Sequence, residues 1–135
     1  LHRDVLFLPA RKTVIVRDRA EGQGEARLET NLLLSPHLDI LMRGDMGCLV
    51  RGKRLHARIN PIFPSRFRYN QARGQTKPFG GWCWGENRRP QPTTRLRFFT
   101  RLPLPATIYL WINWDAREPA VPRPRDLDTL LDGRG

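Results

Sequence analysis

The sequence predicts an all-β protein, an antiparallel β-sandwich that ends in a short irregular tail. Apolar and polar residues alternate with a period of two in several short runs, as they do in half-buried strands. Segments that contain glycine or proline separate these runs and provide turns. Before the C-terminal tail, no segment has the apolar spacing of an amphipathic helix. Several short strands joined by turns are typical of a sandwich.

The segment Lys12–Pro36 predicts two strands joined by a tight turn. The turn "EGQGE" contains Gly22 and Gly24, and glycine readily adopts the positive φ angles that a hairpin loop requires. In the second strand, the residues that share one face are Ala26, Leu28, Thr30, Leu32 and Leu34. We therefore expect a β-hairpin here that serves as scaffold.

The same alternation continues through the rest of the expected sheet. It is found in the segments Leu38–Arg43, Leu55–Ile59, Arg66–Asn70, Arg95–Leu102 and Thr107–Trp114. The prolines near these runs belong at strand ends, because proline cannot donate to a central ladder. The arginines that alternate with the apolar residues are expected on the solvent side of the sheet.

The domain organisation follows from this pattern. We expect residues 1–115 to form the β-domain and residues 116–135 to form a proline-rich tail. The stretch "EPAVPRPR" at Glu118–Arg125 predicts extended chain, and Asp126–Leu131 predicts one helical turn with Asp126 as its cap. No apolar run approaches the roughly 18–20 residues of a membrane span, so no such span is expected.

The net charge of +11 suggests a polyanionic partner. Of the 24 basic residues 21 are arginines, and they are spread along the chain, with Arg88 and Arg89 the one adjacent pair. We interpret most of them as solvated strand faces and a smaller share as an anion-binding surface. Both nucleic acids and acidic polysaccharides present the repeated negative charges that such a surface would bind.

The sequence offers no candidate catalytic residue, metal ligand or cofactor site. His2, His37 and His56 lie far apart and have no serine, cysteine or glutamate at a recognised spacing. There is no phosphate-binding loop, nucleophile elbow or paired-carboxylate signature. Asp18 is expected to have a structural role, either accepting hydrogen bonds from turn amides or pairing with Arg17 or Arg19.

The stretch "FGGWCWGENRR" at Phe79–Arg89 provides the predicted substrate-binding residues, which are Trp82, Trp84, Arg88 and Arg89. Tryptophan faces stack on sugar rings, and arginine binds carboxylate or sulfate in a bidentate fork. The two tryptophans are two residues apart, so they share a face if the backbone is extended. The alternative, in which they pack against the sheet as a lid on the core, stays open.

Three segments together resemble the late part of the heparinase II/III-like lyases. The first is "HRDVLFLPARKTVIVRDRAEGQGEARLETNLLLSP", which is similar to a strand R-x-V-x-F, then V-I-V-x-D-R-x-E-G-x-G-E, then a strand that ends in L-x-P. The second is "GGWCWGENRRPQP", which is similar to a G-W-x-S-P-x-x-G loop, and the third is "RLPLPATIYLWI", which is similar to the closing strand. The matched positions include Arg3, Asp18, Arg19, Glu21, Gly22, Gly24, Glu25, Pro36, Gly81, Trp82 and Gly85.

The resemblance implies that this β-sandwich is part of a larger lyase sandwich domain that follows an N-terminal α/α-toroid domain. Such enzymes cleave uronate-containing acidic polysaccharides by β-elimination. The family's catalytic tyrosine and histidine lie upstream of the matched region, so the chain alone is expected to be inactive. Leu33 stands where family members often have a histidine. A periplasmic or cell-envelope location follows from the same resemblance.

The alternative is a small basic β-domain that binds RNA or another polyanion without catalysis. The net charge favours it, and Phe67, Tyr69 and Phe98 alternate with arginines in the way that a base-stacking surface would require. The absence of clustered basic residues and of a recognised RNA-binding signature is against it. Nucleic acid is therefore the less expected partner.

Overall fold

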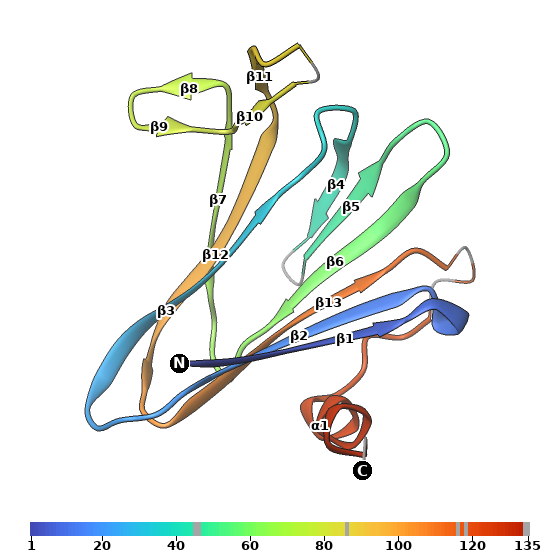
Figure 1. Ribbon diagram of the computed structural model, residues 1–135. Helices are drawn as coiled ribbons and strands as arrows, with labels where there is room; N and C mark the ends of the chain where they lie inside the picture. Colours follow the sequence, from blue (N-terminus) through green and yellow to red (C-terminus); the bar gives the residue numbers. More distant parts are fainter. Residues whose placement is uncertain (45–46, 86, 116, 118, 134–135) are drawn as a thin grey trace.

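Two antiparallel sheets face each other in the computed structural model, which describes residues 1–44, 47–85, 87–115, 117 and 119–133 (Figure 1). The six-stranded sheet has the order β1 (His2–Leu8), β2 (Thr13–Ala20), β13 (Ala106–Asn113), β6 (His56–Ile62), β5 (Gly47–Arg51) and β4 (Asp39–Gly44). The three-stranded sheet has the order β3 (Glu25–Leu33), β12 (Thr94–Pro103) and β7 (Arg68–Arg73). The all-β, sandwich-like fold that the sequence predicts is thus confirmed.

Smaller elements complete the structure. A 3-10 turn, Pro9–Arg11, joins β1 to β2. Two short ribbons follow β7, formed by β8 (Gln75–Thr76) with β9 (Phe79–Gly80) and by β10 (Trp82–Trp84) with β11 (Pro90–Pro92). We call these two ribbons, residues 75–92, the lobe. The helix α1 (Pro124–Asp132) lies near the C-terminus.

The segment expected to be a hairpin has two strands, but they do not pair with each other. Strand β2 pairs with β1 and β13, whereas β3 pairs with β12 in the other sheet. The glycine turn therefore carries the chain across the sandwich, with φ angles of +137° at Gly22 and +78° at Gly24. The Gly24 carbonyl accepts a hydrogen bond of 2.8 Å from the Leu104 amide. Because β13 occupies the ladder position beside β2, β3 pairs with β12 instead.

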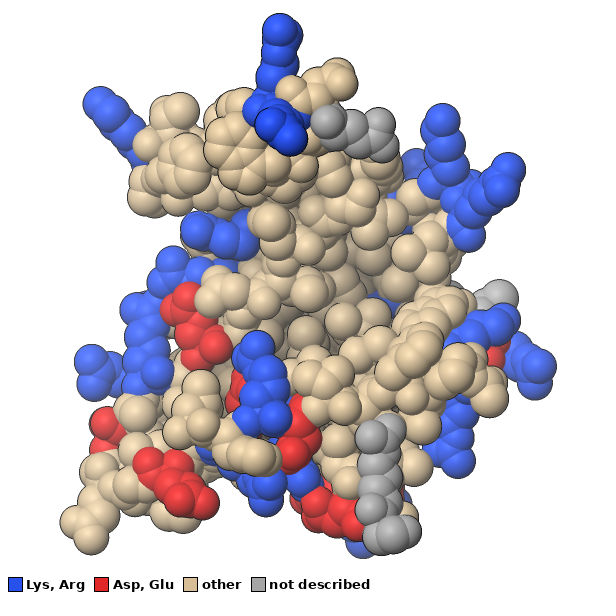
Figure 2. Space-filling view, viewed as in Figure 1, with Lys and Arg blue, Asp and Glu red and all other residues tan. Residues whose placement is uncertain are grey.

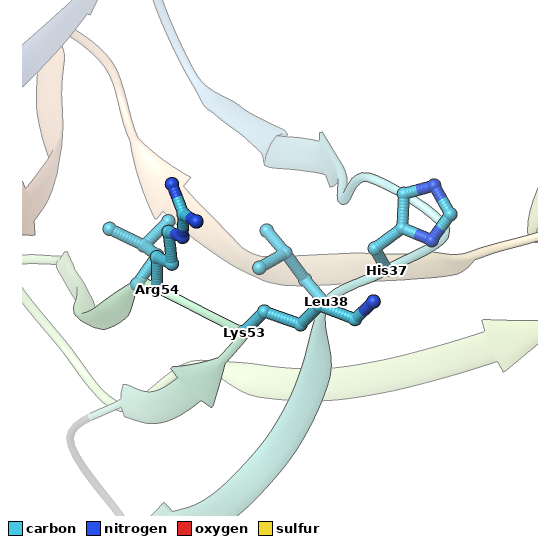
Figure 3. Close-up of a pocket in the computed structure, with 6 residues that line it drawn as sticks. His37, Leu38, Lys53 and Arg54 are labelled. Atoms are coloured by element: carbon cyan, nitrogen blue, oxygen red, sulfur yellow. The ribbon is translucent and has the colours of Figure 1, made fainter.

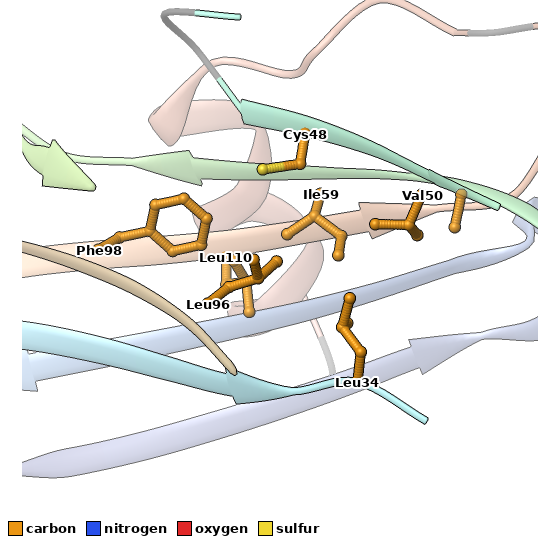
Figure 4. Packing of buried hydrophobic residues seen from close by; sticks show 8 residues of the cluster. Leu34, Cys48, Val50, Ile59, Leu96, Phe98 and Leu110 are labelled. Carbon is orange, nitrogen blue, oxygen red and sulfur yellow. The ribbon is translucent and has the colours of Figure 1, made fainter. Parts of the chain in front are cut away.

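The main core lies between the two sheets (Figure 4). It contains buried residues from both layers, which are Leu34, Cys48, Val50, Ala57, Ile59, Leu96, Phe98 and Leu110. The predicted alternation along β12 is confirmed, since Leu96, Phe98 and Leu102 are buried. Phe67 and Tyr69 pack against this core, with ring centroids 5.8 and 5.3 Å from that of Phe98. The aromatic residues considered for base stacking thus face the interior.

The outer face of the six-stranded sheet has a second apolar cluster, which helix α1 covers. Strand β13 is buried on both faces, because Leu110 points to the main core while Tyr109 and Trp111 contribute to the cluster under the helix. Leu127 of α1 is fully buried in that cluster. The segment after Asp115 is therefore not simply an irregular tail, since it includes a helix that closes this face.

The helix is longer than the single turn expected from the sequence. Arg123 is its N-cap residue, Pro124 occupies the first helical position, and Asp126 is the third residue. The Asp126 carboxylate accepts a hydrogen bond of 3.2 Å from the Arg123 backbone amide. Asp126 thus caps the helix from inside its first turn, as one half of a capping box, and not from the N-cap position.

A buried arginine joins the helix to the sheet. Arg17 of β2 is 4% exposed, and its guanidinium donates to Asp4 of β1 at 3.0 Å. It also donates to Asp128 at 2.9 Å and to Asp132 at 2.7 Å, both on α1. These hydrogen bonds raise the pKa of Arg17 and lower the pKa of Asp4 and Asp132. The guanidinium therefore remains charged, and both elements supply its counter-ions.

The alternation of side chains along β2 decides which partners the polar residues near Arg17 have. Burial, together with a hydrogen bond of 2.8 Å to Asp128, raises the pKa of Tyr109. Asp18 points away from Arg17 and Arg19 because adjacent side chains in a strand face opposite sides. Its partner is Arg3 of β1, whose Nε and Nη2 donate to it at 2.6 and 2.7 Å. The expected pairing of Asp18 with Arg17 or Arg19 is thus wrong.

Some expected features lie outside the described residues. They include Asp45 and Met46 of one turn, Glu86 of the tryptophan stretch, and Ala116 and Glu118 at the start of the expected tail. Among the helices that the structure describes, none is long and apolar enough to cross a membrane.

The substitution Leu127→Ala is expected to lower the free energy of unfolding by about 2–4 kcal/mol, because it leaves a cavity between helix and sheet. Chemical denaturation measures this change. Arg125→Ala, at an exposed position on the same helix, is the control and should change stability by less than about 0.5 kcal/mol. Equal effects of the two substitutions would mean that the helix is not docked.

The Arg17 ion pairs predict a specific dependence of stability on pH. Since the folded-state pKa values of Asp4 and Asp132 are lowered, their contribution is complete near neutral pH and is lost as pH falls below about 4. The difference in unfolding free energy between the wild type and Arg17→Met should be largest near neutral pH and should narrow in acid. Denaturation at a series of pH values tests this, with Arg101→Met as the exposed control. A difference that is constant with pH would contradict it.

Candidate polyanion-binding surface

The structure brings the four predicted site residues together in the lobe. Trp82 and Trp84 lie on β10, and the chain then turns back into β11. The turn is closed by hydrogen bonds from the Gly85 amide to the Arg89 carbonyl, 2.9 Å, and from the Arg88 amide to the Gly85 carbonyl, 3.0 Å. Arg88 has a φ of +54° in this turn, and both arginines are exposed. They therefore lie at the tip of the ribbon that contains the tryptophans.

One face of this ribbon is apolar. In the β10–β11 register Trp82 is opposite Pro92 and Trp84 is opposite Pro90. Residues directly opposite each other in an antiparallel pair have their side chains on the same face. The two tryptophans and the two prolines therefore share a face, as the spacing of the tryptophans predicts for an extended backbone. Cys83 lies on the other face.

The two tryptophans differ in their surroundings. The Trp82 indole is half-buried, donates from Nε1 to the Gln75 carbonyl at 2.9 Å, and stacks on Phe79 with ring centroids 6.3 Å apart. Trp84 is 77% exposed. Neither belongs to the buried clusters of the sandwich. Trp82 thus holds the lobe together, whereas the face of Trp84 is available to a ligand.

Two consecutive glycines fix the lobe to the three-stranded sheet. A side chain at Gly81 would collide with the Ala72 carbonyl, and the residue has a φ of +74°. Its own carbonyl accepts hydrogen bonds of 2.8 Å from the amides of Gly74 and Thr93. A Cβ at Gly80 would lie 2.9 Å from Cζ of Arg95. At Gly81 the backbone of the lobe therefore approaches the backbone of β7 closely, and the hydrogen bonds to its carbonyl anchor the lobe there.

Charge is distributed unevenly over the molecule (Figure 2). In this view the acidic side chains lie in the middle and lower parts, several of them near α1 and the β2–β3 turn, whereas basic side chains occur throughout. The upper half, which contains the lobe and the loops beside it, shows blue side chains among uncharged ones. Because opposite charges attract over about a Debye length, a polyanion should approach this end.

Two aromatic residues that the sequence pattern does not mark as functional are exposed or lie among charges. Phe79 in the lobe is 72% exposed and enlarges the aromatic surface. Phe99 lies on the outer face of the three-stranded sheet, with the guanidinium carbons of Arg27 and Arg97 at 4.3 and 5.1 Å from its ring centroid. Both arginines also pair with Glu29, at 3.2 and 3.0 Å, so their charge is partly neutralised there.

Sequence signals for these residues are weak. Phe79 follows a proline and precedes two glycines, a pattern that indicates a turn and says nothing of exposure. Phe99 stands among the arginines of β12, where the alternation does predict the outer face. Among the described residues, no group of three or more His, Cys, Asp or Glu is placed to hold a metal ion.

Comparison with known proteins adds no relative, since no family model, curated protein or solved structure matches this chain.

The different surroundings of the two tryptophans predict different effects on the lobe. Trp82→Ala removes a ring stack and a hydrogen bond, so the Gly74 and Thr93 amides that hold the lobe should exchange with solvent faster, by about tenfold for each 1.4 kcal/mol of lost local stability. Trp84→Ala should leave their exchange unchanged. Hydrogen exchange measured by NMR distinguishes the two, and equal protection in both variants would contradict the assignment.

Proposed function

We propose that this β-sandwich is a non-catalytic domain that binds uronate-containing acidic polysaccharides through the lobe. The observation that supports the proposal most directly is the 77% exposure of Trp84 on a ribbon whose tip contains two exposed arginines. Phe79, 72% exposed, extends the same apolar surface. Large exposed aromatic groups with a polar rim are typical of interaction sites.

The chemistry of the surface fits a charged sugar. An indole face packs against the C–H face of a sugar ring, and a guanidinium binds a carboxylate with two parallel hydrogen bonds. A uronate presents both groups on each unit, so one residue of the polymer can contact Trp84 while its carboxylate contacts Arg88 or Arg89. A neutral sugar would gain the first contact and not the second.

The resemblance to the heparinase II/III-like lyases supports the same ligand. On this proposal the chain is the C-terminal β-domain of a lyase, beside an α/α-toroid domain, in the periplasm or cell envelope. The β-elimination would be carried out by residues upstream. In the part of the chain that the structure describes, His2 pairs with Asp4 at 2.9 Å, while His37 lies in the β3–β4 loop and His56 begins β6. These described histidines therefore do not place a general base and a general acid close to one another.

Calorimetric titration with a uronate oligosaccharide, and with a neutral oligosaccharide of equal length, tests the proposal. Trp84→Ala should weaken binding of both by about tenfold, the effect of losing roughly 1.4 kcal/mol of stacking. Arg88→Gly combined with Arg89→Ala should weaken binding of the uronate alone, and glycine suits the positive φ at position 88.

Matched controls distinguish a site from general attraction. Leu41→Ala removes an exposed apolar side chain elsewhere, and Arg101→Ala removes an exposed charge; neither should alter affinity. Wild-type affinity in Trp84→Ala would reject the lobe as the site. Displacement of the uronate by a short RNA at lower concentration would favour the RNA-binding alternative.

A further inference from the structure

A cavity opens between the β3–β4 loop and the β5–β6 turn, at the end of the sandwich where the lobe also lies (Figures 1 and 3). It has a volume of about 360 Å³ and is lined by His37, Leu38, Gly52, Lys53, Arg54 and Leu55. This volume is within the usual range for small-molecule sites. None of these residues belongs to the lobe, so the cavity is separate from the proposed polysaccharide surface.

The floor of the cavity is aliphatic. Leu38 is half-buried and packs against the main core, and Leu55 is 36% exposed. The Gly52 amide donates to the Leu55 carbonyl at 2.7 Å, which closes the β5–β6 turn. A Cβ at Gly52 would lie 2.7 Å from Cδ2 of Leu38, so glycine is what allows the leucine to lie against the turn. The shape of the floor thus depends on this contact.

The rim of the cavity is basic. Figure 3 shows Leu38 between the guanidinium of Arg54 and the ring of His37, with the Lys53 side chain extending toward His37. All three polar side chains belong to exposed residues, and no lining residue is acidic. In the described part of the chain, neither Lys53 nor Arg54 forms an ion pair. Both also line a neighbouring hollow that contains Asp115, whose carboxylate accepts a hydrogen bond from the Arg117 amide.

We propose that this cavity binds a small organic anion with an aliphatic body, namely a medium-chain monocarboxylate. The two leucines offer the body an apolar surface, and the carboxylate pairs at the rim with Lys53 on one side of Leu38 or with Arg54 on the other. The lining has no Phe, Tyr or Trp ring on which a sugar would stack. This inference goes beyond the proposed function and does not depend on it.

Octanoate is the test ligand, with octanol and acetate as its neutral and short counterparts. In an NMR titration, octanoate should shift the amide signals of residues 37–38 and 52–55. Its dissociation constant should be at least tenfold lower than that of octanol or acetate. Equal affinity for acetate would mean that the cavity attracts any anion and does not recognise the aliphatic body. Equal affinity for octanol would mean that it binds apolar molecules without recognising the carboxylate. Either result, or shifts confined to other residues, overturns the proposal.

Variants test the two parts of the cavity separately. Lys53→Ala combined with Arg54→Ala should weaken octanoate binding about tenfold and leave octanol unaffected. Gly52→Ala keeps the charge but displaces Leu38, so it should weaken both ligands. Leu55→Asp, at a partly exposed position of the floor, places a carboxylate in the cavity and should abolish octanoate binding even if Gly52→Ala fails to fold. Arg101→Ala, on the other sheet, should have no effect, and an equal loss there would overturn the proposal.

Discussion

The structure depends on two neighbouring strand pairs, β2 with β13 in one sheet and β3 with β12 in the other. Both β2–β3 and β12–β13 are continuous in sequence and cross from one sheet to the other at the same end of the molecule (Figure 1). The inward faces of these strands therefore meet, and the main core forms between them. Each of the other elements is added to this frame.

The frame places β13 in the middle of the six-stranded sheet, where both of its faces must be covered. The inner face is covered by the three-stranded sheet, and the outer face is covered by α1. Apolar contacts through Leu127 provide the attraction, and the Arg17 ion pairs fix the orientation of the helix. A buried charge is costly unless it is fully paired, and here three carboxylates surround one guanidinium.

In the same frame, the residues that stabilise the fold and the residues proposed to bind ligands lie toward opposite ends of the molecule. Most of the acidic side chains seen in Figure 2 lie toward the end where the strands cross and where the helix lies, and several of them hold the structure together. The opposite end is formed by the lobe, the β3–β4 loop and the β5–β6 turn. These segments are anchored to the sheets and carry Trp84, Arg88, Lys53 and Arg54 toward solvent. Both proposed sites use the surplus positive charge of this end.

The sequence by itself determined the fold class and most strand positions, because a period of two is a local property of the chain. It did not determine which sheet each strand joins, since pairing depends on contacts between distant residues such as Gly24 and Leu104. The sequence predicted one helical turn at Asp126–Leu131 but not its docking on the sheet, because the partner of the short apolar stripe Leu127, Leu130 and Leu131 is the outer face of β13. Only the tertiary structure distinguished Trp82 from Trp84 and assembled the Lys53 cavity, because burial is decided by neighbours that are remote in sequence.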